Sequence, residues 1–408
     1  MSIKKAGNMG RANRAVLVII FLVLFVFVIG LLRARRMNNT NTDSSALETS
    51  AQPENTSAKV ELPGYPLRRI TDKGGRVAWY HGAQHELIAY DSIVNQLNKN
   101  TEIFTMTPEG TQVTCVTCKS ANPRGFVGQP SWYPDGEHLV YQAENSNSKH
   151  GLYNHMAWGI NQDLWFVRKD GTGAELIWES EENHGALHPH FSPDGTKIIF
   201  SERIATGVKV LGLLFISPGG ENPWDGWQIH IADFDITKTG KEKLSNHTIL
   251  YAGTKGFYET HGFTADGKIM YSRTEKGHPY VDDVFIANAD GSSAQNLTNS
   301  PKTWDEHGNF SSSGRGMAFM SSRADPAWRP ADGAKALRTE LFLQNNTGVI
   351  QLTQFNAGKN TTKRYLVSDY DWDTAGNRIA FQVAPVGDRP QNTESPQIWM
   401  MDLNSSEP

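Results

Sequence analysis

The segment Phe191-Ser-Pro-Asp-Gly-Thr-Lys-Ile-Ile-Phe-Ser-Glu202 decides the fold, because its pattern returns along the chain. An aromatic residue precedes a Pro-Asp-Gly turn, and a largely apolar strand follows the turn. Further copies, with turns of decreasing similarity, begin at Trp132, Phe263, Phe310, Trp372 and Trp79. Asp-Gly turns supply the positive φ that tight hairpins require. Each copy therefore predicts a β-hairpin.

A second strand pair follows most copies, as in the stretch DVFIANADGSSAQNLTN at residues 283–299. Four such strands form a blade that cannot bury both of its faces alone, so blades stack around an axis and close into a ring. The pattern predicts an all-β, six-bladed β-propeller over residues 61–404. The sixth copy has no fourth strand of its own, and residues 66–72 resemble the fourth strands of other copies. We expect this N-terminal strand to close the ring; the alternative is a linker.

The repeat resembles the TolB-type, WD40-like propeller repeat, whose signature is F/W-S-P-D-G-x-x-I-x-F. The resemblance extends over about residues 62–403, and the copies that begin at Trp132, Phe191 and Phe263 carry it most specifically. It implies a six-bladed propeller that is exported and used mostly for protein binding. It does not imply catalysis, because one fold hosts many functions.

The N-terminal region predicts a membrane anchor. Residues 15–32 are continuously apolar and long enough to cross a bilayer as a helix. A cleaved signal peptide is the alternative, but the run ends in Leu-Leu-Arg-Ala-Arg-Arg, a poor cleavage site. Four basic residues precede the helix and three follow it. We therefore expect a cytoplasmic tail at 1–14, a single-pass helix at 15–32 in an inner or plasma membrane, and a disordered tether at 33–60. The propeller would lie on the periplasmic or extracellular side.

The charge balance limits the partners. The whole chain carries a formal net charge of −4, and residues 61–408 alone carry −9. An acidic body without a basic stripe argues against nucleic-acid binding. The membrane, through residues 15–32, and a protein or peptide are the partners that we expect.

Loop lengths distinguish the two faces of the predicted propeller. The Pro-Asp-Gly and Asp-Gly turns share one face, whereas the long segments 143–162, 203–226, 323–338 and 384–396 share the other. Long loops on a rigid scaffold usually carry binding residues. We therefore expect binding on the long-loop face, with Trp224 and Trp227 among the ligand contacts.

Ionisable residues just before the innermost strands of four blades should converge at the channel on that face. Four imidazoles are candidate ligands for a divalent metal such as Mn, Zn or Ca: His188, His190, His261 and His307. Other ligand-binding candidates are His184, Glu259, Glu306, Asp369 and Asp371. A bound metal, a metal-free ligand pocket and a structural polar lining remain open, so no cofactor is assigned.

The sequence favours a non-catalytic binding propeller. It has no G-x-S-x-G, H-E-x-x-H or Walker motif. The alternative is a metal-dependent carbohydrate enzyme, because His188-Pro-His190 is similar in kind to the central histidines of oligogalacturonate lyases, which hold a divalent metal. The membrane anchor departs from that family, and its catalytic base has no matching position in this sequence.

Cys115 and Cys118 are the two cysteines of the chain, in a C-x-x-C spacing. Zinc would need two more ligands, and a thioredoxin-like site would need a helix N-terminus. A structural disulfide in an oxidising compartment is the favoured interpretation, with free thiols as the alternative.

Overall fold

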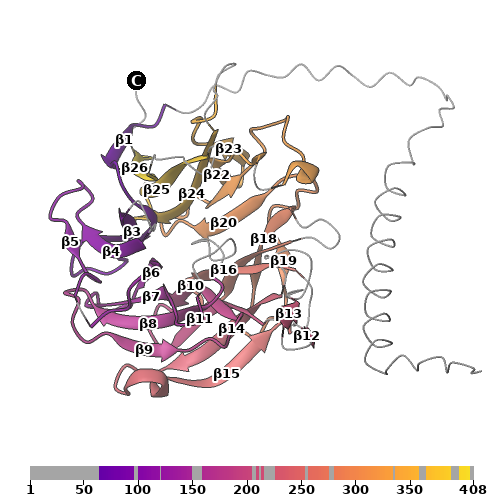
Figure 1. Ribbon diagram of the computed structural model, residues 1–408. Coiled ribbons are helices and arrows are strands. Elements are labelled where there is room, and N and C mark those ends of the chain that lie inside the picture. The colour runs from indigo at the N-terminus through magenta and orange to yellow at the C-terminus, as the bar shows by residue number, and fades with distance from the viewer. Residues whose placement is uncertain are drawn as a thin grey trace, which may run out of the picture. The chain divides into compact units, whose positions relative to one another are not determined.

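Six four-stranded antiparallel sheets are arranged around an axis in the described part of the chain, in a computed structural model (Figure 1). The structure describes residues 64–95, 100–119, 121–148, 159–204, 208–210, 213–215, 226–252, 256–274, 280–333, 336–357, 364–386 and 395–404. In five of the sheets the strands pair in chain order from the axis outward. The chain is thus the all-β, six-bladed propeller that the repeat predicts.

The first three blades each form from one continuous part of the sequence. Blade 1 comprises, from the innermost strand to the outermost, β2 (Gly75–Trp79), β3 (Ile88–Asn95), β4 (Asn100–Met106) and β5 (Thr114–Cys115). In the same order, blade 2 comprises β6 (Val127–Trp132), β7 (His138–Glu144), β8 (Gln162–Arg168) and β9 (Glu175–Trp178). Blade 3 comprises β10 (Gly185–Phe191), β11 (Lys197–Arg203), β14 (Trp227–Phe234) and β15 (Leu244–Leu250).

Blade 4 comprises β16 (Tyr258–Phe263), β17 (Ile269–Thr274), β18 (Asp282–Ala287) and β19 (Gln295–Asn296). Blade 5 comprises β20 (Asp305–Phe310), β21 (Met317–Ser321), β22 (Glu340–Asn345) and β23 (Gly348–Gln351). Blade 6 comprises β24 (Arg364–Trp372), β25 (Arg378–Val386), β26 (Gln397–Asp402) and β1 (Leu67–Thr71). A two-stranded sheet, β12 (Val208–Val210) and β13 (Leu213–Phe215), lies in sequence between β11 and β14.

The Pro-Asp-Gly turns form for local reasons. Between β10 and β11, the carboxylate of Asp194 accepts hydrogen bonds from the Ser192 hydroxyl at 2.6 Å and from the Thr196 amide at 3.0 Å. Gly195 has a φ of 71°, which a residue with a side chain rarely adopts. The repeated turn therefore fixes where each innermost strand ends.

The hydrophobic core lies between neighbouring blades. Ala78 and Ile103 of blade 1 pack with Leu139 and Tyr141 of blade 2 in one buried cluster. A second cluster joins blade 1 to blade 6, through buried side chains that include Trp79, Ile88, Ala380, Ile398 and Met400. The first and last blades are therefore neighbours, as a closed ring requires.

The N-terminal strand β1 pairs antiparallel with β26, with Leu67 opposite Met401 and Thr71 opposite Ile398. It supplies the outermost strand of blade 6, the position that the C-terminal segment leaves open. Arg68 adds a bond from its guanidinium to the carbonyl of Pro108 in blade 1, at 2.8 Å. That this strand locks the ring in solution stays a prediction.

The expected tail at 1–14, membrane helix at 15–32 and tether at 33–60 all lie outside the described residues. Within the residues that are described, no helix has the length and apolar character needed to cross a bilayer.

Deleting residues 1–72 should lower the free energy of unfolding by about 3 kcal/mol relative to a chain that begins at residue 64, because the ladder bonds of β1 are lost. Urea unfolding, monitored by tryptophan fluorescence, measures the difference. Equal unfolding midpoints for the two chains would show that β1 does not stabilise the ring.

Candidate functional site

The innermost strand of each described blade breaks register with its neighbour near its middle, as in a β-bulge. A residue in the left-handed region lies at each break. These residues are Arg76 (φ 45°), Gln129 (52°), His188 (49°), Gly262 (102°), His307 (55°) and Asp369 (41°). A left-handed residue with a side chain costs about 1–2 kcal/mol, so five such residues must be held by their surroundings.

Side chains of the preceding blade hold several of these bulges. The backbone N–H of Gln129 donates to the Asp91 carboxylate at 3.1 Å. The backbone N–H of His188 donates to the side-chain Oε1 of Gln129 at 3.1 Å. The His307 amide donates to Nε2 of His261 at 3.2 Å. Each amide would otherwise be buried without a partner, which is costly. The bonds connect blade to blade around the axis.

A cavity of about 770 Å³ lies at the centre of the propeller and is lined by residues of all six blades. The bulge residues line it, and so do residues of the short turns, including Pro134, Pro193, Ala265 and Ser312. No described residue of the four long segments lines it. The cavity therefore opens among the short turns, on the opposite face from the one that loop length favours.

The structure brings together six of the residues singled out from the sequence. His188, His190, His261, His307, Asp369 and Asp371 all line the cavity. They lie within the innermost strands β10, β16, β20 and β24 rather than before them. They share the cavity with residues of the short turns, so the prediction that they open on the long-loop face is wrong.

The other candidates lie elsewhere. Glu259 and Glu306 are buried, with 4% and 6% of their surfaces exposed, and do not line the cavity. His184 is half-buried outside the cavity, with its Nε2 4.0 Å from Glu181. Trp227 is fully buried against Leu187 and Phe257, so its indole has no surface to offer a ligand. Trp224 lies outside the described residues.

Burial keeps most of the cavity histidines neutral. It lowers the pKa of His188 and of His190 to about 3, and neighbouring imidazoles contribute to both shifts. It also lowers the pKa of His261 well below its usual value. A neutral imidazole can donate and accept a hydrogen bond or bind a metal. The ring of His190 lies against Gly262, where a Cβ would approach it to 3.4 Å.

His307 and Asp369 behave differently. Burial disfavours the charge on His307, but the nearby carboxylates of Asp369, Glu259 and Glu306 outweigh it and raise the pKa of His307. Burial likewise opposes the charge on Asp369, but His307 and Arg76 lower its pKa overall. Arg76 is itself paired with Asp91 at 2.7 Å. His307 and Asp369 thus each favour the charged form of the other, unlike the histidines that burial keeps neutral.

Two groups of side chains in this region have donor atoms within 4.8 Å of one another and could hold a metal ion. One is His188, His307 and Asp369; the other is Glu259, His261 and His307. His190 belongs to neither group, although it is one of the four histidines that the sequence suggested as ligands.

Sequence reasoning missed Arg76 and Gln129, which occupy the same structural position as His188, His307 and Asp369. A signal was present. Each of these five residues lies three positions before the aromatic residue that opens its repeat. Counting back from that residue would have found all five.

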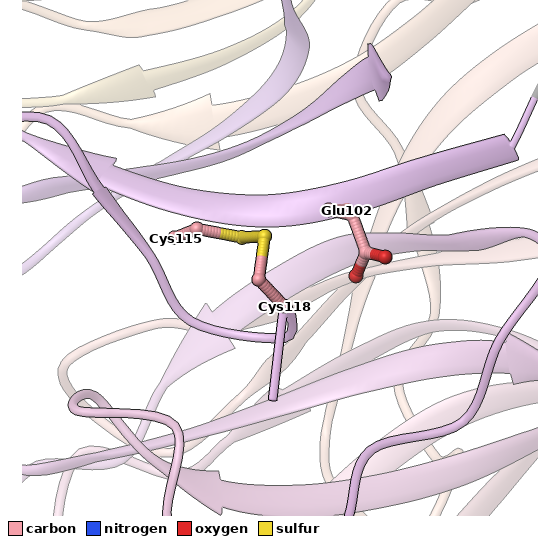
Figure 2. Close-up of side chains that lie close together, drawn as sticks. All are labelled: Glu102, Cys115 and Cys118. Carbon is pink, nitrogen blue, oxygen red and sulfur yellow. A yellow bond between two sulfur atoms is a disulfide. The ribbon is translucent and has the colours of Figure 1, made fainter. Parts of the chain in front are cut away.

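Cys115 and Cys118 form a disulfide at the end of blade 1 (Figure 2). The Glu102 carboxylate lies beside it and accepts hydrogen bonds from Thr117 at 2.5 Å and from Arg124 at 3.1 Å. Arg124 also donates to the carbonyl of Cys118 at 3.1 Å. Because the two sulfurs are bonded to each other, this group is a structural disulfide rather than a metal site.

The fold and cavity define a six-bladed β-propeller with a central polar pocket. Solved structures similar to it include TolB from Acinetobacter baumannii, at 16% identity and a TM-score of 0.43, covering 79% of this chain and 64% of that one. Another is a putative TolB from Agrobacterium tumefaciens, at 15% identity and a TM-score of 0.44, covering 70% and 81%. A third is oligogalacturonate lyase from Vibrio parahaemolyticus, at 13% identity and a TM-score of 0.43, covering 84% and 95%.

These structures represent the two groups that the repeat resembles in sequence. Neither a protein-family model nor a curated protein matches the sequence. These TM-scores are too low for the similarity to define the fold. The assignment of a propeller therefore rests on the pairing of this chain's own strands.

Replacing His190 with Gln should flatten the pH dependence of stability on the acid side. The pKa of His190 is about 3 in the folded chain, against an ordinary 6.5, so below about pH 6.5 the unfolded chain binds a proton that the folded chain does not. Stability therefore falls as the pH drops, by up to about 1.4 kcal/mol per pH unit for one proton, and the variant loses this contribution.

Chemical unfolding between about pH 7 and pH 4 tests this expectation. His85→Gln, outside the cavity lining, controls for the loss of a histidine as such. Parallel pH profiles for the natural chain and His190→Gln would contradict the neutral state of His190.

Proposed function

We propose that this chain is a membrane-anchored, exported binding propeller that receives a segment of a protein or peptide in its central cavity, without catalysing a reaction. The observation that carries the proposal is the cavity itself, to which all six blades contribute. Its volume of about 770 Å³ falls in the range of pockets that enclose a small ligand or a few side chains. A short extended segment fits it better than a folded domain.

The lining suits a peptide with both apolar and polar groups. Phe310, which is 43% exposed, and Phe263 both line the cavity and can cover apolar side chains. Deeper in, neutral His190 can bond a backbone amide or carbonyl, and Asp369 and Arg76 offer opposite charges. A backbone presents donors and acceptors in alternation, so a lining with both kinds of group is suited to it.

The short-turn face is therefore the face that we propose for binding. The long-loop face was favoured because its loops are longer, but large parts of those loops lie outside the described residues. The cavity is a specific feature of the opposite face, whereas the binding of ligands by long loops is only a general tendency. We do not propose a metal-dependent carbohydrate enzyme as the function of this chain.

We further propose that residues 15–32 anchor the chain in an inner or plasma membrane and that the propeller lies outside the cytoplasm, with β1 closing its ring. The apolar run supports the anchor. The disulfide between Cys115 and Cys118 supports an oxidising compartment, because such bonds are rare in the cytosol.

A photoreactive amino acid at position 310 should crosslink the partner in intact cells, whereas the same amino acid at position 349 should not. Phe310 and Val349 are 43% and 44% exposed, but Val349 lies on β23 at the outer edge of blade 5. Mass spectrometry of the crosslinked product identifies the partner. Crosslinks from position 224, in the long segment 203–226, but none from 310 would reverse the assigned face.

Alkaline phosphatase fused after residue 60 should be active, because the enzyme needs an exported, oxidising environment. Deletion of residues 15–32 from the fusion should abolish the activity and release the product from the membrane fraction. An inactive fusion that stays in the membrane fraction would place the propeller in the cytoplasm.

A further inference from the structure

Neighbouring blades meet at seams on the short-turn face, and the side chains at these seams differ around the ring. Tyr80 of blade 1 fills the seam with blade 2: its hydroxyl donates to the carbonyl of Pro134 at 2.9 Å, and a Cβ on Gly136 would lie 2.7 Å from its ring. Tyr133 of blade 2 fills the next seam in the same way, because a Cβ on Gly195 would lie 2.8 Å from its ring. Tyrosine therefore closes the first two seams.

Hydroxyl groups close the seams on either side of blade 6. The Ser311 hydroxyl of blade 5 donates to the carbonyl of Gly376 at 2.8 Å, and the Ser312 hydroxyl donates to the carbonyl of Thr374 at 2.8 Å. The Thr374 hydroxyl in turn donates to the carbonyl of Tyr80 in blade 1 at 3.1 Å. These bonds join the turns of blades 5, 6 and 1.

The seams on either side of blade 4 lack such a side chain. The residues that correspond to the two tyrosines are Ser192 in blade 3 and Thr264 in blade 4, and both hydroxyls bond within their own turns. Gly267 and Gly314 are the glycines of the turns that follow. Apart from chain neighbours, a Cβ on either glycine would meet no atom of the described residues within 4 Å. Small side chains thus leave these two seams open.

The cavity extends outward from the axis at the seam between blades 4 and 5. Ile286, on β18, lines the cavity, and it is the one described lining residue that belongs to neither an innermost strand nor a short turn. Its side chain packs against a buried cluster that includes Phe319 and Phe342 of blade 5. Ile286 therefore lies where blade 4 meets blade 5.

Phe310 forms a second apolar wall of this extension. Its position in the repeat lies beside the preceding blade, since the equivalent Trp132 and Trp372 donate their indole N–H groups to Ala78 and Asn309 of the blades before them. Phe310 lines the cavity and is 43% exposed. Its counterparts in the other five blades are half-buried in one case, Phe263, and buried in the others: Trp79, Trp132, Phe191 and Trp372.

Two polar side chains in the cavity lining are available to a ligand. They are His190, whose ring lies against Gly262 of blade 4, and Asn309, which directly precedes Phe310. Neither side chain forms a hydrogen bond with another residue that the structure describes. An imidazole and an amide can each donate and accept, which suits the alternating N–H and C=O groups of a peptide backbone.

We propose that the extension between blades 4 and 5, walled by Phe310 and Ile286, is a specificity pocket for one apolar side chain of the bound peptide. The inference rests on the proposed function and deepens it, because it names the class of peptide. The nearby charges of Asp266 and Lys268 are paired with each other at 2.8 Å, so the pocket selects for no charge. Burial of an apolar side chain against an exposed aromatic ring favours binding.

The size of Thr264 keeps the pocket open. Thr264→Tyr would place a tyrosine in the turn of blade 4 at the position that Tyr133 occupies in blade 2. By the same geometry its ring would extend toward Gly314 and fill the pocket. Phe310→Ser acts differently, because it removes a wall without filling the space.

Panning a phage-displayed library of random short peptides on the full-length protein in detergent tests the pocket. We expect the selected peptides to share one apolar residue at a fixed position, because burial of one apolar side chain strengthens binding by about tenfold or more. The same panning on Thr264→Tyr and on Phe310→Ser should lose that preference.

Two variants outside the cavity lining are matched controls. Thr347→Tyr, in the turn between β22 and β23, also adds a tyrosine and removes a threonine hydroxyl that bonds within its own turn. Val349→Ser removes an apolar side chain that is 44% exposed, as Phe310 is at 43%. Both should select the same peptides as the natural chain.

A double-mutant cycle then shows whether the apolar residue occupies the pocket. Its replacement with serine in a selected peptide should weaken binding to the natural chain by about tenfold, measured by fluorescence polarisation. The same replacement should weaken binding to Phe310→Ser by less than about threefold, because the wall of the pocket is already absent.

The outcomes separate this inference from the proposed function. Selected peptides without a shared apolar residue, or a preference that persists in both Thr264→Tyr and Phe310→Ser, overturn the pocket and leave a peptide-binding propeller. If no peptide is enriched on the natural chain, the proposed function fails and the pocket fails with it. Thermal unfolding of each variant, followed by tryptophan fluorescence, distinguishes loss of the pocket from loss of the fold.

Discussion

A buried backbone amide must have an acceptor, and around the axis of this propeller that requirement is met across blades. At the left-handed bulges the amides turn away from their own sheet, so side chains of the neighbouring blade accept their bonds. Asp91, Gln129 and His261 are therefore structural residues, and Gln129 and His261 also line the cavity. The residues that line the cavity cannot be exchanged freely, because several of them also hold the adjacent backbone in a conformation that it would otherwise avoid.

The repeat alone predicted the fold, because turn chemistry and strand periodicity are local properties that a sequence displays directly. The convergence of His188, His261 and His307 followed from the same repeat, since the innermost strands of a ring must meet at the axis. The face on which they meet did not follow, because it depends on bulges. A glycine in a sequence indicates where a positive φ can occur. Arg76, Gln129 and Asp369 have side chains, so the sequence gives no such indication for them. The buried Asp282 escaped attention for another reason: it lies on the third strand of its blade, outside the turn and innermost-strand pattern of the repeat.

The polar residues at the centre divide into two chemical environments. The cavity lining includes His188 and His190, which burial keeps neutral, and His307 and Asp369, each of which favours the charged form of the other. Beyond them lie Glu259, Asp282 and Glu306, whose pKa values are all raised by burial in the first place. His307 contacts both environments, because it lines the cavity and lies 3.9 Å from two of the acids. His188, whose Nε2 lies 2.5 Å from Oε1 of Glu259, also lines the cavity, so a change in the charge of the acids would act on the cavity through both histidines.

The pairing of β1 with β26 sets an order of events during synthesis. A ribosome makes β1 first and β26 last, so β1 must remain without its partner while nearly the whole propeller is translated. An unpaired strand is a template for association with other chains, and charged side chains reduce that hazard. Arg68 and Arg69, which lie in the middle of β1, are suited to protect the nascent chain until the C-terminal blade arrives.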